Sequence, residues 1–157
     1  MANKTTKWWC DSCGQEISSV EDGWVEWISL KNGKAIRGLR LVHHQPASPR
    51  GPDSSCQYDG QDEYKRDGGV LSDLPFNNFS GANGLMMLLT LLKSGLSVDD
   101  FIAMAQRLHI PGYERARFHA VAAKNEGVFE PNLPPEFYWQ KDIERILEWA
   151  DENELEP

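Results

Sequence analysis

The chain of 157 residues has only three cysteines and no long hydrophobic run. Three thiols cannot all pair, which excludes the disulfide framework that braces many small secreted proteins. The longest largely apolar stretch, residues 85–92, is too short to cross a bilayer. Residues 1–9 lack the apolar segment of a secretory signal. Together these absences predict a cytoplasmic protein with no membrane partner.

The chain also lacks the motifs of several enzyme classes. It contains no P-loop, no dinucleotide-binding glycine pattern and no recognisable Ser-His-Asp set. The HExxH pattern of zinc proteases and the HxE with PCxxC pattern of zinc deaminases are missing as well. We therefore predict that the protein is not an enzyme, although a catalytic site assembled from distant residues leaves no such motif.

Negative charge is concentrated in the second part of the chain. Residues 1–60 contain seven Lys and Arg against seven Asp and Glu, whereas residues 61–157 contain nine against seventeen. An acidic region repels phosphate backbones at long range. The charge distribution therefore disfavours nucleic acid as a partner. The hydrophobic fraction of 40%, with 10% aromatic residues, is sufficient for a folded core.

The N-terminal part, residues 1–58, has the pattern of a β-hairpin module. Residues 24–30 and 35–44 are rich in Val, Ile, Leu and Trp. β-Branched and aromatic residues favour strands. Asn32 and Gly33 lie between them and suit a tight turn in which both residues have positive φ. Three prolines between residues 45 and 56 then indicate a loop that leads to the last cysteine.

The rest of the chain is predicted to be mainly helical. Residues 59–75 are polar and glycine-containing, so we expect a linker or long surface loop there. Residues 76–152 contain four segments with helical features: 80–93, 97–109, 111–127 and 138–152. The first is apolar over most of its circumference, which predicts a central helix. The last places Ile143, Ile146, Leu147 and Ala150 on one face. Residues 153–157 form an acidic tail.

Four metal-binding side chains are available in the first module. Cys10 and Cys13 are separated by two residues, a spacing that lets a tight turn aim both sulfurs at one ion. The hairpin then returns the chain to His43 and His44, and Cys56 follows the proline-containing loop. Zn²⁺ prefers four such ligands in a tetrahedron, and a full set with three thiolates indicates a closed site. We predict one structural zinc ion bound by Cys10, Cys13, His43 and Cys56.

The choice of histidine depends on the register of the second strand. Side chains alternate between the two faces of a strand, so Leu39, Leu41 and His43 share one face. This face is the more apolar one and favours His43. A bulge in the strand would reverse the alternation, and His44 therefore remains the alternative ligand.

The sequence CxxCG followed by a β-hairpin resembles zinc-ribbon and treble-clef knuckles. The resemblance covers about a third of the chain and implies a zinc-bound fold, but little about activity. The predicted fold class is α+β. A zinc-ribbon or treble-clef-like knuckle with its hairpin is followed by a bundle of about four helices, and aromatic residues pack the two together.

Aromatic residues suggest a binding function. Large aromatic side chains are favoured anchors in protein interfaces, although packing between modules accounts for many of them. They gather in the zinc module and again downstream, at Trp8, Trp9, Trp24, Trp27, Tyr113, Phe137, Tyr138 and Trp139. We predict a zinc-stabilised adaptor or regulator that binds a protein partner.

Two alternatives remain open. Segment 97–128 has the outline of a helix-turn-helix or winged-helix element of a DNA-binding regulator, with Arg115, Arg117, His119 and Lys124 as candidate contacts. The same outline is typical of two packed helices in an ordinary bundle.

The second alternative is a metal-dependent nuclease. The sequence VHH at the end of a strand, and Asn83 before a leucine-rich helix, resemble parts of HNH enzymes. This resemblance implies that His43 or His44 acts as general base and that Asn83 orients it. However, Asn83 lies forty residues beyond His43, and short motif fragments match by chance.

Overall fold

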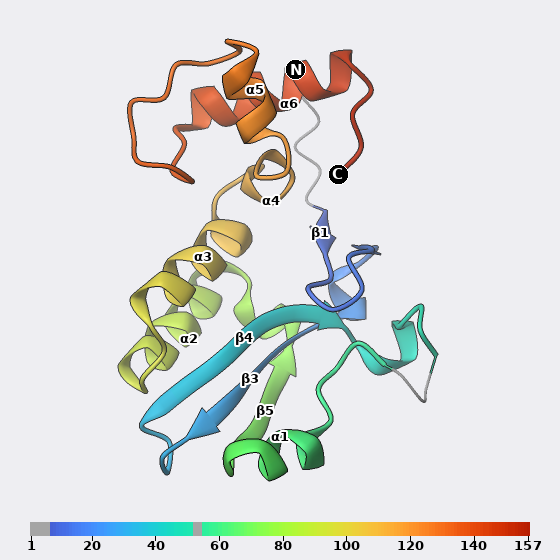
Figure 1. Ribbon diagram of the computed structural model, residues 1–157, viewed down its shortest axis with the longest axis vertical. Helices are drawn as coiled ribbons and strands as arrows, with labels where there is room; N and C mark the ends of the chain where they lie inside the picture. The colour runs from blue at the N-terminus through green and yellow to red at the C-terminus, as the bar shows by residue number, and fades with distance from the viewer. Residues whose placement is uncertain (1–6, 52–54) are drawn as a thin grey trace. The chain divides into compact units, whose positions relative to one another are not determined.

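The computed structural model describes residues 7–51 and 55–157 (Figure 1). The chain divides into two compact units: Trp8–His109, and Ile110–Pro157 grouped with Lys7. Within the described residues, no helix combines the length and the apolar character needed to cross a membrane.

The hairpin expected in the first unit is confirmed. Strand β3 (Gly23–Leu30) pairs antiparallel with β4 (Ala35–His43). The loop between them has positive φ at Asn32 (57°) and Gly33 (81°), as predicted, and also at Lys31 (54°). The loop therefore bends over more residues than a two-residue turn does.

A third strand completes the sheet. Strand β5 (Val70–Pro75) pairs antiparallel with β3, so the strand order is β4-β3-β5 and β3 is central. Helix α1 (Gly60–Asp67) precedes β5 along the chain. Residues 59–75, expected to be a linker or surface loop, therefore contain a helix and a strand of the main sheet.

Helix α1 is held by polar contacts, which explains why its sequence did not predict it. The Asp59 side chain caps it by accepting hydrogen bonds from the backbone N–H groups of Gln61 and Asp62. On β4, Arg37 donates to Glu63 and Asp67 at 2.8 Å each. These contacts stabilise a helix that has almost no apolar face.

Short elements surround the sheet. Strands β1 (Trp8–Trp9) and β2 (Glu16–Ile17) form a small antiparallel ladder around the first two cysteines. Single 3₁₀ turns follow at η1 (Val20–Asp22), η2 (Gln45–Ala47) and η4 (Phe76–Phe79). Turn η4 contributes two buried rings to the core: Phe76 packs edge-on against Trp8, and Phe79 against Trp27.

Helices α2 (Gly81–Lys93) and α3 (Val98–His109) complete the first unit. Ser97 caps α3, as its sequence predicts, by accepting a hydrogen bond of 3.1 Å from the N–H of Asp100. Gly84 allows α2 to approach η4, because a Cβ atom there would lie 1.9 Å from the carbonyl carbon of Phe79. The core between these helices and the sheet includes Leu88, Leu91 and Met104.

The prediction that α2 is a central helix is wrong. Leu88 and Leu91 are buried, but Leu85, Met86 and Leu89 are 38%, 63% and 42% exposed. Within its unit, α2 packs against η4 and α3, and this leaves one apolar face of the helix uncovered. The apolar pattern alone did not distinguish a surrounded helix from one with an uncovered face.

The second unit is helical. The helix expected over residues 111–127 is two shorter helices, α4 (Tyr113–Ala116) and α5 (Ala120–Asn125), because the chain turns tightly at residues 117–119. Helix α6 (Gln140–Glu152) buries Ile143, Ile146, Leu147 and Ala150, which confirms the predicted face.

The α+β class is therefore confirmed, but the expected bundle of about four helices is not one body. Helices α2 and α3 belong to the first unit, whereas α4, α5 and α6 belong to the second.

Candidate metal centre

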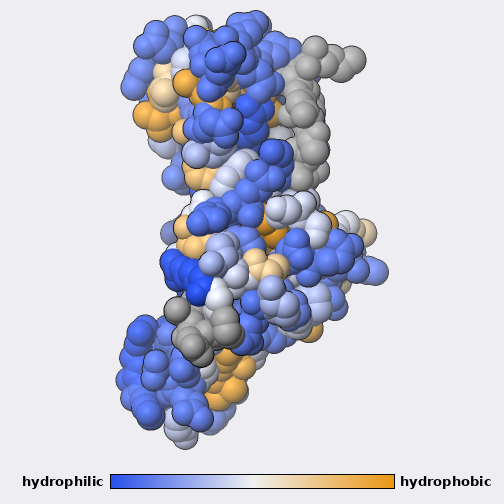
Figure 2. Space-filling view, turned by 90° about the vertical axis from the view of Figure 1, so that its right-hand side faces the viewer, coloured by the Kyte–Doolittle hydropathy of each residue, from blue (hydrophilic) through white to orange (hydrophobic). Residues whose placement is uncertain are grey.

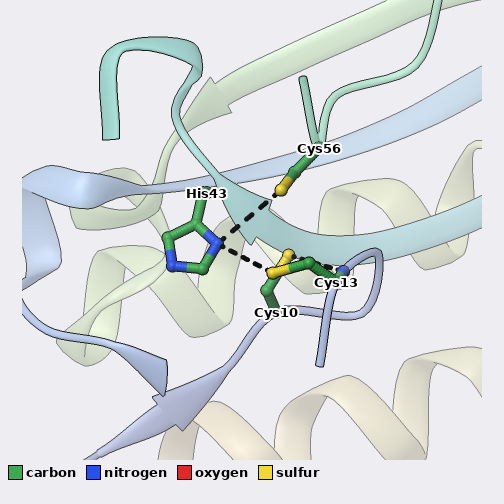
Figure 3. A group of neighbouring side chains, drawn as sticks. All are labelled: Cys10, Cys13, His43 and Cys56. Atoms are coloured by element: carbon green, nitrogen blue, oxygen red, sulfur yellow. Dashed lines mark hydrogen bonds between the residues drawn. The ribbon is translucent and has the colours of Figure 1, made fainter. Parts of the chain in front are cut away.

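Four side chains from three parts of the first unit meet at one point (Figure 3). Cys10, Cys13, His43 and Cys56 each present one ligand atom, and these four atoms lie within 4.8 Å of one another. His43 Nδ1 is 3.4 Å from Cys13 Sγ and 3.8 Å from Cys56 Sγ. The three cysteines are not joined by disulfides.

The two shorter separations, from His43 to Cys13 and to Cys56, suit a tetrahedral ion. Zinc–sulfur bonds of about 2.3 Å and zinc–nitrogen bonds of about 2.0 Å give tetrahedral edges of about 3.5 to 3.8 Å. The two His43–cysteine distances of 3.4 and 3.8 Å are close to these edges. Thiols buried only as small apolar side chains would not be expected to gather three sulfurs around one imidazole nitrogen.

The turn that carries Cys10 and Cys13 is shaped by its own backbone. Gly14 donates to the carbonyl of Cys10 at 2.9 Å and has a φ of 76°, which favours glycine. The N–H groups of Ser12 and Cys13 both point at Cys10 Sγ, at 3.4 Å. The turn therefore offers hydrogen bonds to a thiolate at residue 10.

The pKa values of the two thiols are shifted in opposite directions. Burial acts to raise the pKa of Cys10, but backbone N–H groups, first that of Cys13, lower it to about 7. Burial, together with the neighbouring Cys10 sulfur, raises the pKa of Cys13 to about 11. A bound cation would lower the pKa of both thiols, because it stabilises adjacent thiolates.

Asp11 fixes the turn to the rest of the unit. Its N–H donates to the carbonyl of Leu41, and its carboxylate accepts from the Leu41 N–H, each at 2.8 Å. Arg107 on α3 donates to the same carboxylate at 2.8 Å and to the Trp9 carbonyl at 3.2 Å. Residue 11 thus links the cysteine turn to β4 and to α3.

His43 is oriented so that Nδ1 faces the sulfurs. Its Nε2 lies 2.9 Å from the carbonyl oxygen of Glu16 on β2. A carbonyl can only accept, so Nε2 carries the proton, and in the neutral ring Nδ1 then keeps a lone pair. Such a partner on the remote nitrogen is usual for histidines that bind metals.

The structure places His43 in the cluster, and His44 outside it. The half-buried His44 ring lies beside Trp24, with the ring centroids 4.9 Å apart. β4 does contain a bulge, since Trp27 on β3 faces both Gly38 and Leu39. The bulge precedes Arg40, so Leu41 and His43 still share a face as the alternation predicts.

Cys56 is positioned by an ion pair between buried Glu26 and half-buried Arg40, which the sequence did not predict. Glu26, at 0% exposure, accepts a hydrogen bond of 2.7 Å from Arg40 and bonds of 3.0 and 3.1 Å from the Tyr58 N–H. Arg40 also donates to the Cys56 carbonyl at 3.0 Å and stacks on the Tyr58 ring. Glu26 and Arg40 therefore hold the backbone on both sides of residue 57.

One signal could have pointed to this pair. Glu26 is the only charged residue in the strand sequence GWVEWISL, and a carboxylate inside a central strand needs a buried partner. Arg40 lies directly opposite it in the hairpin register.

The loop before Cys56 is tied to the cysteine turn. Ser48 Oγ lies 3.2 Å from Cys56 Sγ. Arg50 donates to the Ser12 carbonyl at 2.7 Å and to the Ser12 hydroxyl at 3.0 Å. These contacts join the loop before Cys56 to the turn that carries Cys10 and Cys13.

No protein-family model matches this chain, and neither a curated protein nor a solved structure matches it. The function must therefore be inferred from the chemistry of the side chains themselves.

The residues expected to serve a nuclease or a DNA-binding element do not gather into one site, and two of the cationic ones are paired with acidic side chains. Asn83 is exposed on α2, and His43 belongs to the thiol cluster. Arg115 pairs with Asp151, and Arg117 pairs with Glu114 at 2.9 Å, so both cations have acidic partners. His119 is buried. Lys124 is exposed at the end of α5. Residues 97–109 and 113–125 also fall in different compact units.

Proposed function

We propose that Cys10, Cys13, His43 and Cys56 bind one zinc ion with a structural role. The observation that carries this proposal is the convergence of four soft ligand atoms within 4.8 Å, with the imidazole already in the required tautomer. Three thiolates and one imidazole complete a tetrahedron and leave no position for a reactive water. The ion would stabilise the fold and activate no substrate.

The arrangement of the first unit indicates what the ion stabilises. The ligands come from the N-terminal turn, the end of β4 and the loop that follows it. The short strands β1 and β2 brace that turn, and hydrogen bonds of Asp11 and Ser12 tie it to β4, α3 and Arg50. Because a structural zinc ion contributes its binding energy to folding, it would join these three segments into one body.

Elemental analysis tests the zinc site. Protein purified without chelator and without added metal is expected to contain one zinc per chain. Replacement by Co²⁺ should give the visible absorption of a tetrahedral thiolate site. Protein without stoichiometric metal, whose folding is unchanged by EDTA, would refute the proposal.

We further propose that the protein works as an adaptor or regulator that binds another protein. The support is the uncovered face of α2, where Leu85, Met86 and Leu89 lie within one turn of one another. Figure 2 is viewed from the side away from α2, and the surface seen there is mostly hydrophilic with separate hydrophobic patches. Adjacent exposed Leu and Met side chains are typical of interaction sites.

A pair of matched variants tests this second proposal. Tagged wild-type protein recovered from its host should retain a stoichiometric partner. Met86→Glu should lose that partner, because it places a charge in the apolar face. Gln61→Glu, which adds the same single negative charge at an exposed position of α1, should retain it. Equal recovery with Met86→Glu and wild type would exclude the α2 face as the interface.

A further inference from the structure

A polar cavity lies in the second unit, far along the sequence from the thiol cluster. It has a volume of about 340 Å³, near the lower end of the usual range for small-ligand sites. It lies where the loop after α5 meets the first two turns of α6. Its lining residues are Glu130, Pro131, Asn132, Lys141, Asp142 and Arg145.

Asp142 is the unusual residue of this cavity. Its side chain lines the cavity, and the residue is only 5% exposed. Among the described residues, its carboxylate has no hydrogen bond and no ion pair. Its oxygens are not among the fully buried side-chain atoms that lack a hydrogen-bond partner, so they reach the water of the cavity. Asp142 therefore has unused capacity to accept hydrogen bonds from a ligand.

The other charged residues of the cavity are also unpaired. Across residues 7–51 and 55–157, neither Lys141 nor Arg145 lies within ion-pair distance of a carboxylate, and Glu130 has no cationic partner. Lys141 and Arg145 are four residues apart and so share a face of α6. The start of the helix adds its own preference for a negative group. The cavity is thus lined by two carboxylates and two cationic side chains that form no ion pairs with one another.

This pattern selects the charge of a ligand. A divalent cation would be repelled by Lys141 and Arg145, and a simple anion would be repelled by Asp142 and Glu130. A small molecule that carries both charges satisfies all four groups. Asn132 is already engaged, since its Oδ1 accepts a hydrogen bond of 2.9 Å from the Trp139 indole. It helps to fix the loop that forms the cavity wall.

We propose that this cavity binds a small zwitterion of the amino acid or short peptide class. Its ammonium group donates to Asp142 and Glu130, and its carboxylate accepts from Lys141 and Arg145. The site is independent of zinc binding, because none of its residues belongs to the thiol cluster.

An NMR titration of the full-length protein tests the proposal. The probes are L-leucine and glycyl-L-leucine, each compared with its N-acetyl form, which lacks the ammonium, and its amide, which lacks the carboxylate. At least one zwitterion is expected to shift amide signals of residues 130–145 in a saturable way. Both blocked forms should bind at least tenfold more weakly. No saturable shift with either zwitterion at millimolar concentration would overturn the proposal, as would equal binding of a blocked form. The two zwitterions distinguish a free amino acid from a peptide.

Three variants identify the residues responsible. Asp142→Asn and Lys141→Gln should each weaken zwitterion binding at least tenfold, whereas Glu148→Gln, on an exposed part of the same helix, should leave it unchanged. If Asp142→Asn lowers thermal stability but binds normally, Asp142 is only a helix-stabilising carboxylate and the proposal fails. If Asp142→Asn does not fold, the exposed Lys141→Gln decides the matter, and unchanged binding there refutes the proposal.

Discussion

The two units of this protein solve the same problem, burial of a small core, with different chemistry. The unit Trp8–His109 contains a sheet, a buried Glu26–Arg40 pair and the cluster of three thiols and an imidazole. The unit Ile110–Pro157 is built of helices around an apolar core. Its core residues are Tyr113, Ala116, Ala120, Ala123, Phe129, Ile143, Ile146 and Leu147. Stability of the first unit should therefore depend on metal and charge as well as on its apolar core, and that of the second on packing alone.

The largest difference between the units should appear when a ligand of the ion is removed. His43→Ala is expected to abolish stoichiometric zinc and the amide NMR signals of the sheet, because structural zinc contributes about 10 kcal/mol or more to such modules. Signals of the second unit should persist. His44→Ala, one residue away and outside the cluster, is the control and should keep one zinc per chain. Equal metal content in the two variants would contradict the assignment of His43.

The converse experiment removes packing from the second unit. Ile146 is fully buried, so Ile146→Ala should destabilise this unit by about 2–5 kcal/mol through lost contacts and a residual cavity. Zinc content should not change. Urea unfolding followed by NMR signals of each unit measures the effect, with the exposed Glu148→Ala as control. Loss of zinc from Ile146→Ala would show that the units do not depend on separate interactions.

A smaller effect is expected from the ion pair behind Cys56. Glu26→Gln keeps the shape of the side chain but leaves the charge of Arg40 uncompensated, which should cost about 1–3 kcal/mol. Zinc affinity should fall as well, because Arg40 and Glu26 hold the backbone around Cys56. Competition with a chromogenic chelator measures this affinity. The exposed Glu21→Gln should behave like wild type, and the idea fails if Glu26→Gln binds zinc as tightly.

The smallest effect should come from the surface pair Arg37–Asp67. Hydrogen bonds from Arg37 hold the pKa of Asp67 below its ordinary value. In the folded protein the carboxylate therefore binds its proton less readily than in the unfolded chain. The stabilisation is complete above the unfolded pKa of about 3.9 and is lost as the pH falls through the lower folded pKa. Wild type should exceed Asp67→Asn in melting temperature near neutral pH, and this gap should narrow in acid. A difference in melting temperature that does not depend on pH would contradict the claim that the ionised Asp67 carboxylate stabilises the fold.

The sequence was most informative where spacing and chemistry acted together. The CxxC pair, the hairpin and a downstream cysteine predicted which side chains meet, and the structure brings Cys10, Cys13, His43 and Cys56 within 4.8 Å. Strand alternation correctly placed His43 beside Leu41, because the bulge at Gly38 and Leu39 precedes both. Whether these four residues bind zinc stays a prediction.

Other features could not be predicted because they depend on tertiary contacts. Helix α1 has a polar sequence and is held by Arg37 from another strand. Strand β5 is short, follows Gly69 and ends at Pro75, so its sequence resembles a loop until β3 is available as a partner. The break between α4 and α5, at residues 117–119, contains neither proline nor glycine, so the sequence gives no signal for it. Ala116, before the break, and Ala120, after it, both lie in the core of the second unit.

The tether at Cys56 has a consequence for how the protein would exchange its ion. The Cys56 carbonyl and the Tyr58 amide are bonded to Arg40 and Glu26, and neither bond requires a metal. Departure of an ion would release the sulfur, but not the chain segment that carries it. The third thiol would then stay at a high local concentration near the other ligands, so recapture would avoid most of the entropy of closing the loop from residue 43 to residue 56.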